Sequence, residues 1–557
     1  MKKYLIYIAI ASSTLATSCK DFLDLVPSHT IVDNNFWQTE SQLRAAADAI
    51  YGRIDNKTTV DMEQMADNTQ WHQLANWGRI GAGIIPNDFS TVEGTWTNNY
   101  GNIGECNRFL ANYDRAKETA PGNKERMAAE VKVLRAFFYY QLAFLFGDVP
   151  LITTPLESDD PKVYGKRDPK EQVIDFILED LDDAIALLPA EIPEGKATGR
   201  IAKGAALAIK ARIALYNERW SVAEKAAKDL MDLNLYQLYT AGGADNAYRD
   251  LFTHAGKLIK GNNKETILAR MNLHGTSVHN LSREIQVQEH CRWNATASLA
   301  EAYLCSDGLP IDISDLYNDA NYNTIWENRD PRMEQTLLRP GHKWGGGWDG
   351  SPATTDPTVF TAPKFTQLQP NGNRTGSRTI TGYYFTKYVE IPEVARVGQD
   401  ENDIHLIRLA EVYLTYAEAK MKQGTLTQDD LDISINKLRD RVGMRHMRLD
   451  EISANSLDLE TEIRRERRVE LALEGQRYFD ILRWREGELL GKDMRGIKAT
   501  WAPVPAHLGS LPVDADGYIV VRPGERVFNP AKHYLWPIPA QQIQYNPNLE
   551  QNPNWEE

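Results

Sequence analysis

The amino-acid sequence predicts a mostly α-helical protein, in which a scaffold of irregular helix pairs carries one large, loop-rich insert. Apolar residues recur with helical spacing over several long runs, and short turns join neighbouring runs. Between residues 233 and 402, by contrast, Gly, Asn, Thr, Pro and aromatic residues are frequent and long helical patterns are scarce. With 557 residues, of which 42% are hydrophobic, the chain is long enough to bury a large core.

The N-terminus predicts an exported protein. Two lysines precede an apolar run at residues 4–10, which is too short to cross a bilayer, and small residues follow it before Cys19. This order resembles a bacterial lipobox. We therefore predict that residues 1–18 are a signal peptide and that Cys19 becomes the lipidated first residue. An ordinary signal peptide with an incidental cysteine is the alternative.

The first part of the scaffold, residues 36–232, contains the clearest helical patterns. Apolar residues nearly encircle the second half of the run at 124–146, which predicts a buried helix. Alanines in the pair 201–216 and 221–232 let the two helices approach closely, a spacing typical of tetratricopeptide-like pairs. The predicted helices are 41–54 (with Ser41 as N-cap), 102–116, 124–146, 171–188, 201–216 and 221–232.

The second part of the scaffold, residues 403–490, begins with a predicted helix pair and continues into an unusually charged stretch. The pair comprises residues 403–423 and 428–441. In the stretch that follows, Glu462, Glu466, Glu470 and Glu474 recur every fourth residue and so form one stripe on a helix.

Arginines alternate with these glutamates, at positions 464, 465, 467 and 468. A guanidinium within one turn keeps a carboxylate ionised, whereas a general acid needs a raised pKa. We therefore predict that Glu466, Glu470, Arg467 and Arg468 belong to a structural ion network that joins two helices and has no catalytic role. Gly475 is predicted to end the first of these helices in a left-handed conformation.

The C-terminal residues 491–557 are rich in Pro and Asn and predict a wrapping segment with little regular structure. We interpret residues 19–557 as one packed unit, composed of the scaffold at 36–232 and 403–490, the insert at 233–402 and this segment.

Residues Glu466 to Trp484 follow the order E-R-R-x-E-L-x-x-E-G-x-R-x-x-D-x-x-R-W. This order resembles the C-terminal signature of the SusD/RagB family, the nutrient-binding outer-membrane lipoproteins of Bacteroidetes-type bacteria. The runs LRAFFYYQLAFLFGDVPL (134–151), LAEAYLCSDGLPI (299–311) and TGYYFTKY (381–388) extend the resemblance to nearly the whole chain. It implies a lipoprotein at the outer-membrane surface that captures a glycan and passes it to a SusC-like TonB-dependent transporter.

Charge and motifs argue against several other classes of protein. The formal net charge is −14, which disfavours nucleic acid as a ligand because phosphates require patches of Lys and Arg. The sequence contains no GxSxG, HExxH or Walker motif. Cys106, Cys291 and Cys305 show no metal-ligand spacing, and a Cys291–Cys305 disulfide and buried free thiols both remain open. We predict no catalytic residues, no cofactor and no metal site.

Tryptophans in irregular segments are the candidate ligand contacts. A flat indole matches the apolar face of a sugar ring, while amide, carboxylate and guanidinium groups bind its hydroxyls. In the family, glycan contacts come from loops before the second helical region and from the central insert. The predicted ligand-binding residues are Trp71, Trp77 and Trp293 as stacking platforms, Asp67, Asn68 and Arg292 as hydroxyl partners, and Trp344 and Trp348 beside a triple glycine.

Two alternatives to glycan capture are kept open. The RagB side of the family implies a peptide-binding lipoprotein. An outer-membrane glycoside hydrolase would need only two carboxylates at the right separation, although nothing in the sequence selects such a pair. For each single tryptophan, packing in the core is the alternative to ligand contact.

Overall fold

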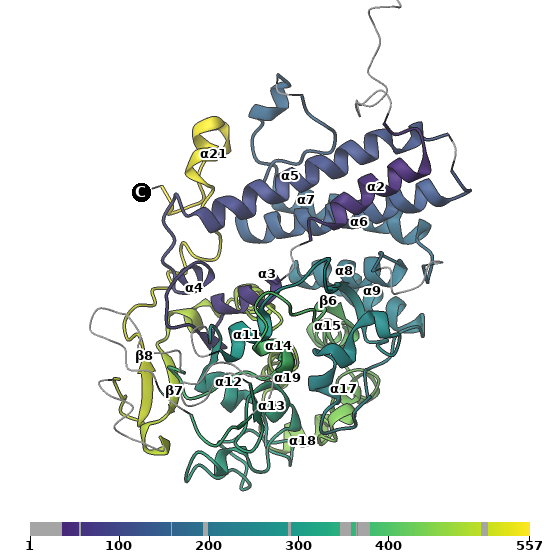
Figure 1. Ribbon diagram of the computed structural model, residues 1–557. Helices are drawn as coiled ribbons and strands as arrows, with labels where there is room; N and C mark the ends of the chain where they lie inside the picture. The colour runs from purple at the N-terminus through teal and green to yellow at the C-terminus, as the bar shows by residue number, and fades with distance from the viewer. Residues whose placement is uncertain are drawn as a thin grey trace, which may run out of the picture.

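The structure, a computed structural model, describes residues 36–54, 57–117, 119–157, 159–192, 199–287, 291–345, 358–363, 365, 379–502 and 511–556. It is mostly helical, as the sequence predicts (Figure 1). The predicted signal peptide and Cys19 lie outside the described residues.

The helices are α2 (Glu40–Tyr51), α3 (Thr58–Asp61), α4 (Trp77–Gly81), α5 (Ser90–Asn112), α6 (Asn123–Phe146), α7 (Lys170–Leu187), α8 (Lys203–Tyr216), α9 (Trp220–Asp232), α10 (Ala247–Asp250), α11 (Leu281–Gln286), α12 (Ala297–Ala302), α13 (Pro331–Thr336), α14 (Ile391–Val394), α15 (Leu409–Lys422), α16 (Gln428–Asp432), α17 (Ile435–Val442), α18 (Leu449–Ala454), α19 (Leu459–Glu470), α20 (Arg477–Arg483) and α21 (Ala540–Tyr545). The strands form four antiparallel pairs: β1 (Thr69–Gln70) with β3 (Asn294–Ala295), β2 (Thr266–Arg270) with β6 (Ile404–Arg408), β4 (Lys343–Trp344) with β5 (Thr358–Val359), and β7 (Met494–Lys498) with β8 (Tyr518–Val521).

The long helices pack one against the next along the chain. Helix α5 contacts α6, α6 contacts α7, α7 contacts α8, and α8 contacts α9, which in turn contacts α15. Figure 1 shows α2, α5, α6 and α7 as one layer, with α8, α9 and α15 beneath it. The predicted helices at 124–146, 171–188, 201–216 and 221–232 are all present, with ends that differ by no more than two residues.

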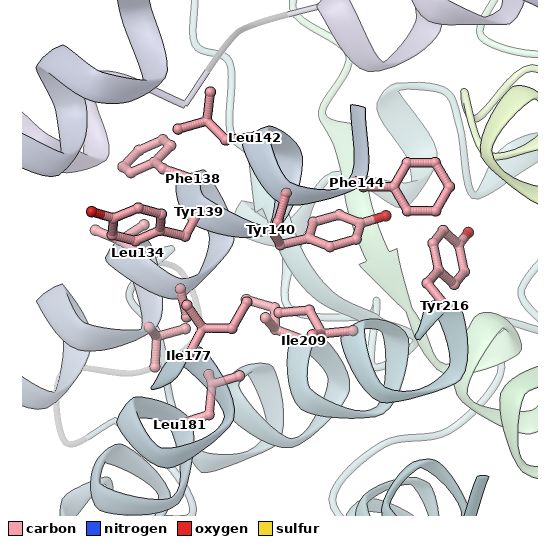
Figure 2. Close-up of a cluster of buried hydrophobic side chains, with 14 of the residues drawn as sticks. Leu134, Phe138, Tyr139, Tyr140, Leu142, Phe144, Ile177, Leu181, Ile209 and Tyr216 are labelled. Carbon is pink, nitrogen blue, oxygen red and sulfur yellow. The ribbon is translucent and has the colours of Figure 1, made fainter. Parts of the chain in front are cut away.

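Helix α6 supplies the centre of the main hydrophobic core. Tyr140 and Phe144 reach Tyr216 of α8 at ring-centroid distances of 5.9 Å and 5.8 Å, whereas Phe138 and Leu142 point to the other side of α6 (Figure 2). Each large apolar side chain buried in this way contributes roughly 1.5–3 kcal/mol relative to its exposed state. The residues labelled in Figure 2 are Leu134, Phe138, Tyr139, Tyr140, Leu142, Phe144, Ile177, Leu181, Ile209 and Tyr216.

Helix α2 begins one residue earlier than the sequence indicated. The amide of Gln42 donates to Oγ1 of Thr39 at 3.3 Å, and the amide of Thr39 donates to Oε1 of Gln42 at 3.1 Å. This reciprocal pair is a capping box, which satisfies two donors at once. The prediction of Ser41 as N-cap is therefore wrong, because Thr39 has the partner at the third helical position.

The described residues between 247 and 394 contain only short helices. Helices α10 to α14 have four to six residues each. The apolar side chains of this region form a second core, to which Val469, Ala472 and Leu473 also contribute. The insert and the charged stretch of the scaffold therefore share one interior.

Residues 404–408 form strand β6 rather than the start of a helix. Their backbone pairs with β2, with Thr266 opposite Arg408 and Ala269 opposite His405. All five residues of β6 are buried. The prediction of a helix from residue 403 is therefore wrong, because pairing with β2 satisfies this backbone before α15 begins at Leu409.

The C-terminal segment has two parts: β7 and β8 pair with each other, with β7 in contact with α12, and the residues around Trp536 and Trp555 pack against the helical layer with little regular structure (Figure 1). Trp536 and Trp555 are 0% and 1% exposed and belong to the main core. The side-chain amide of Asn552 donates to the carbonyl oxygens of Phe146 at 2.9 Å and of Trp536 at 2.7 Å. These bonds fasten the segment to the end of α6.

Candidate functional site

The charged stretch of α19 forms a buried ion network. The carboxylate of Glu470 accepts from Arg408 at 2.7 Å, from Arg441 at 2.7 Å and from Arg332 at 3.0 Å. Burial opposes ionisation of Glu470, but the three positive charges outweigh it and hold the pKa of this carboxyl well below its usual range. A carboxylate held ionised in this way cannot act as a general acid at neutral pH.

The predicted ion network is thus present, but its partners are not the neighbours in sequence. Glu466 pairs with Arg332 at 2.6 Å and with Arg439 at 2.8 Å. Arg467 instead pairs with Asp480 at 2.9 Å, and Arg468 with Asp67 at 3.1 Å. The network joins segments that are distant along the chain.

The strand pair β1–β3 joins the two loop regions that the sequence singled out for ligand contact. Thr69 lies opposite Ala295, and Gln70 lies opposite Asn294. The residues just beyond this pair, Trp71 and Arg292, are consequently neighbours. One of the predicted platforms and one of its predicted polar partners therefore meet at the end of this ribbon.

The guanidinium of Arg292 lies over the indole of Trp71, 5.3 Å from the ring centroid. Trp71 is half-buried, and its Nε1 donor has no hydrogen-bond partner among the described residues. Arg292 also pairs with Glu284 at 3.2 Å and keeps 31% of its side chain exposed. The two side chains offer an aromatic surface and a positive charge, whereas the Nε1 donor itself is buried.

Asp67 and Asn68 hold the fold together and do not face solvent. Asp67 forms ion pairs with Arg477 at 2.8 Å and with Arg468 at 3.1 Å. Asn68 donates to Glu63 at 2.7 Å and accepts from Arg468 at 2.8 Å. The prediction that these two residues bind ligand hydroxyls is wrong, because their side chains are buried and already bonded to other residues of the protein.

Trp293 and Trp344 are core residues in this structure. Trp293 is 1% exposed and Trp344 is 3% exposed, and both belong to the second hydrophobic core. The prediction that they present a stacking face is wrong, because the β1–β3 and β4–β5 pairs turn them into the interior. Trp348 lies outside the described residues.

Trp77 lies in a different place from Trp71, although only five residues separate them in the sequence. It is half-buried at the start of α4, with its ring centroid 6.4 Å from that of Trp536. It lines a groove of about 630 Å³ that is bounded by α5, α6, α3 and the end of α2. Trp71 does not line this groove. Trp71 and Trp77 therefore lie at two separate places on the protein.

The groove beside Trp77 contains ligand-type residues that the sequence analysis missed. Its walls are rich in amides and hydroxyls, namely Thr58, Thr59, Asn76, Ser90, Thr91, Thr95, Asn98, Asn99, Asn102, Gln141 and Gln476. The signal was available, because Thr91, Thr95, Asn98 and Asn102 recur at intervals of three or four residues within α5. We refer to this cavity as the amide groove.

A larger cavity, of about 1090 Å³, lies between α5, residues 150–164 and α21. Its lining is mainly apolar and includes the exposed side chains of Tyr164 and Tyr545. None of the predicted ligand residues lines it. Size alone therefore does not select it as the site.

Other expectations concern cysteines, metals and membrane spans. Cys106, Cys291 and Cys305 are buried free thiols, so the Cys291–Cys305 disulfide is not formed. The residues that the structure describes contain no cluster of His, Cys, Asp and Glu suited to a metal ion. Within the same residues, no helix is both long enough and apolar enough to span a membrane.

Comparison with protein families gives two matches that together span most of the chain. Residues 264–555 match the model of the SusD family, and residues 21–215 match a model described as "Starch-binding associating with outer membrane". The first match covers more than half of the chain, and the protein belongs to the SusD/RagB family.

Individual relatives resemble the chain over most of its length. A SusD-like protein of Bacteroides ovatus is 24% identical over 505 residues, which make up 87% of this chain and 83% of that one. A SusD-like protein of Formosa agariphila is 23% identical over 576 residues, covering 99% of this chain and 98% of the relative.

Solved structures have the same fold. A SusD-like carbohydrate-binding protein of Bacteroides fragilis has a TM-score of 0.79 and 27% identity, and the match covers 92% of this chain and 100% of that chain. A laminarin-binding SusD-like protein has a TM-score of 0.62 and 21% identity, with coverage of 93% and 100%.

Proposed function

We propose that the protein is a cell-surface lipoprotein that binds a glycan at the surface formed by Trp71 and Arg292. One observation carries this proposal: the Arg292 guanidinium lies over a half-buried indole where two distant loop regions meet. An indole face packs against the C–H face of a sugar ring. A guanidinium with five donors binds hydroxyl or carboxylate groups beside it.

Family membership supports a carbohydrate as the ligand. The N-terminal match is to a model described as starch-binding, and one relative with a closely similar fold is a carbohydrate-binding protein. Glu470, the central carboxylate of the signature stretch, is held ionised by three arginines and is therefore unsuited to act as a general acid for hydrolysis. We propose that the captured glycan passes unmodified to a SusC-like TonB-dependent transporter and that Cys19 carries the lipid anchor.

The expected affinity is modest. One exposed stacking contact contributes roughly 1–2 kcal/mol, and a few such contacts give dissociation constants in the micromolar to millimolar range. Ready release suits a protein that hands its ligand to a transporter. Removal of the Trp71 ring should weaken binding about tenfold.

Calorimetric titration with malto-, laminari- and galacturono-oligosaccharides, and with mixed peptides, tests the proposal. We expect an oligosaccharide to bind the wild type and to bind Trp71→Ala about tenfold more weakly. Tyr545→Ala is the matched control, because this tyrosine is 63% exposed but lies at the other cavity. Peptide binding without glycan binding would overturn the proposal, as would equal glycan binding by wild type and Trp71→Ala.

A further inference from the structure

We infer that the protein has a second glycan-binding site, the amide groove beside Trp77. The ligand class rests on the proposed function, but the location rests on separate residues. Trp71 and Arg292 do not line the groove, and Trp77 does. The groove measures about 630 Å³, a volume in the range of small-molecule sites.

The first reason is the polar face that α5 presents to the groove. Thr91, Thr95, Asn98 and Asn102 recur along this one face, whereas Val92, Trp96 and Ile103, about 100° around the helix on the adjoining face, are buried in the core. Such an uncharged amide face is uncommon on a helix that has solvent on one side, where charged residues usually dominate.

Two of these amides are free to bind a ligand. Among the described residues, the side chains of Asn98 and Asn102 have no hydrogen-bond partner within the protein. Each amide has two N–H donors and a carbonyl acceptor, so it can donate a hydrogen bond to a sugar hydroxyl or accept one from it. Neighbouring Asn99 differs, because it donates to the carbonyl of Thr95 at 2.7 Å and supports the face from beneath.

The second reason is the aromatic wall opposite this face. Trp77 is half-buried and packs against the main core, and Phe137, Tyr140 and Phe479 add apolar surface to the groove. Asn76, just before Trp77, has φ 45° and ψ −119°, a conformation that side-chain-bearing residues rarely adopt. Local strain of this kind persists where the surrounding structure fixes it, and it is concentrated at binding sites.

The third reason is charge. None of the described residues that line the groove is an aspartate or a glutamate, although the chain as a whole has a net charge of −14. Of its two arginines, Arg212 is neutralised by Glu411, with Nε to Oε1 at 2.7 Å, whereas Arg53 is exposed at the rim. An aromatic wall, neutral amides and a single positive charge fit a polyhydroxylated chain that is neutral or carries carboxylates, and they disfavour a cation.

Labelling with 5-fluorotryptophan and fluorine NMR can observe each site separately. The resonances of Trp77 and Trp71 are identified by their loss in Trp77→Phe and Trp71→Phe. The wild type is then titrated with the same malto-, laminari- and galacturono-oligosaccharides. We expect one of these glycans to shift the Trp77 resonance, and to do so in Trp71→Ala as well.

The double variant Asn98→Ala, Asn102→Ala should fold normally, because neither amide has a partner in the protein, and should weaken the Trp77 response at least tenfold. Glu105→Ala is the control, since Glu105 is an exposed residue of α5 that lines neither cavity. A glycan that shifts Trp71 but never Trp77 would overturn this inference and leave the proposed function intact. A Trp77 response unchanged in the double variant would also overturn it. No response of either tryptophan to any glycan would contradict both proposals.

Discussion

Arg483 of α20 and Glu418 of α15 form a two-point ion pair inside the protein, with Nη1 to Oε1 at 2.6 Å and Nη2 to Oε2 at 2.7 Å. The indole Nε1 of Trp484 also donates to Oε1 of Glu418, at 2.8 Å. Burial raises the pKa of Glu418, but the charge and hydrogen bonds of Arg483 outweigh burial and lower it to about 2. The pair fastens the signature stretch to the helical layer.

Because of this ion pair, the free energy of unfolding should decrease at low pH. The folded-state pKa of Glu418 lies below its unfolded value near 4.5, so its contribution is complete above that pH and is lost as the pH falls toward 2. The full contribution is about 3 kcal/mol. Glu418→Gln should lower the free energy of unfolding near neutral pH and reduce its loss on acidification, as measured by urea titrations at several pH values. Asp450→Asn, at an exposed ion pair, is the control. Parallel pH profiles for wild type and Glu418→Gln would contradict the assignment.

Glu470 should be essential for stability and irrelevant to ligand binding. Glu470→Ala leaves three buried arginines without this partner and should cost roughly 3–5 kcal/mol. Thermal and urea denaturation measure this loss. Glu451→Ala, at an exposed pair with Arg445, should change stability little. A Glu470→Ala protein with an unchanged melting temperature but altered glycan binding would show that the residue has a functional role instead.

Gly475 should tolerate no side chain. Its φ is 71°, and a Cβ placed there would lie 2.0 Å from the carbonyl oxygen of Thr59. Gly475→Ala should therefore lower the melting temperature far more than Gly443→Ala. Gly443 has a similar φ of 68° but open space around its Cβ position, so alanine there costs only about 1 kcal/mol of backbone strain. Equal effects of the two substitutions would contradict the predicted clash.

Cys19→Ala should release the protein from the membrane. The basic, apolar and small residues before Cys19 predict export and lipidation, which would tether the chain by its N-terminus. Cell fractionation and labelling with a palmitate analogue measure both properties. A Ser18→Ala variant serves as the control, because it keeps a small residue before the cysteine. Continued membrane association and labelling of Cys19→Ala would exclude lipidation at this cysteine.

The sequence predicted α6, α7, α8 and α9 well because their signal is local. The predicted helix at 102–116, by contrast, missed the first half of α5 (Ser90–Asn112). Helices α6, α7, α8 and α9 each bury a face, or in α6 and α8 nearly the whole surface, and their apolar spacing reveals this. Strand β6 was missed for the opposite reason. Its mainly apolar sequence leads directly into α15, and only its pairing with β2 distinguishes it from a helix.

The ion network was predictable in kind but not in its partners. The spacing of Glu466 and Glu470 shows that they share a helix face, and the neighbouring arginines suggested short-range pairs. In the folded protein the partners of Glu470 come from α13, β6 and α17. Contacts between such distant residues depend on the tertiary fold, which one sequence does not specify.

The sequence indicated the candidate site only in part, because a position in a polar loop does not by itself determine whether a side chain is exposed. Trp71 and Arg292 do meet at the surface, as their regions suggested. Trp293 lies in an equally polar loop but is buried, because it packs into the second hydrophobic core. The amides of α5 were not predicted as ligand contacts, because a polar helix face usually indicates plain exposure to solvent.

The position of Glu470 has a consequence for the way the chain is made. Its three arginines, at 332, 408 and 441, precede it in the sequence, so during synthesis each is present before Glu470. Two earlier carboxylates already pair with them, Asp330 with Arg332 and Glu265 with Arg408 and Arg441. Partial ion pairs can therefore form as the chain is made, but only the arrival of α19 joins all three arginines through one carboxylate and fixes the insert to the scaffold.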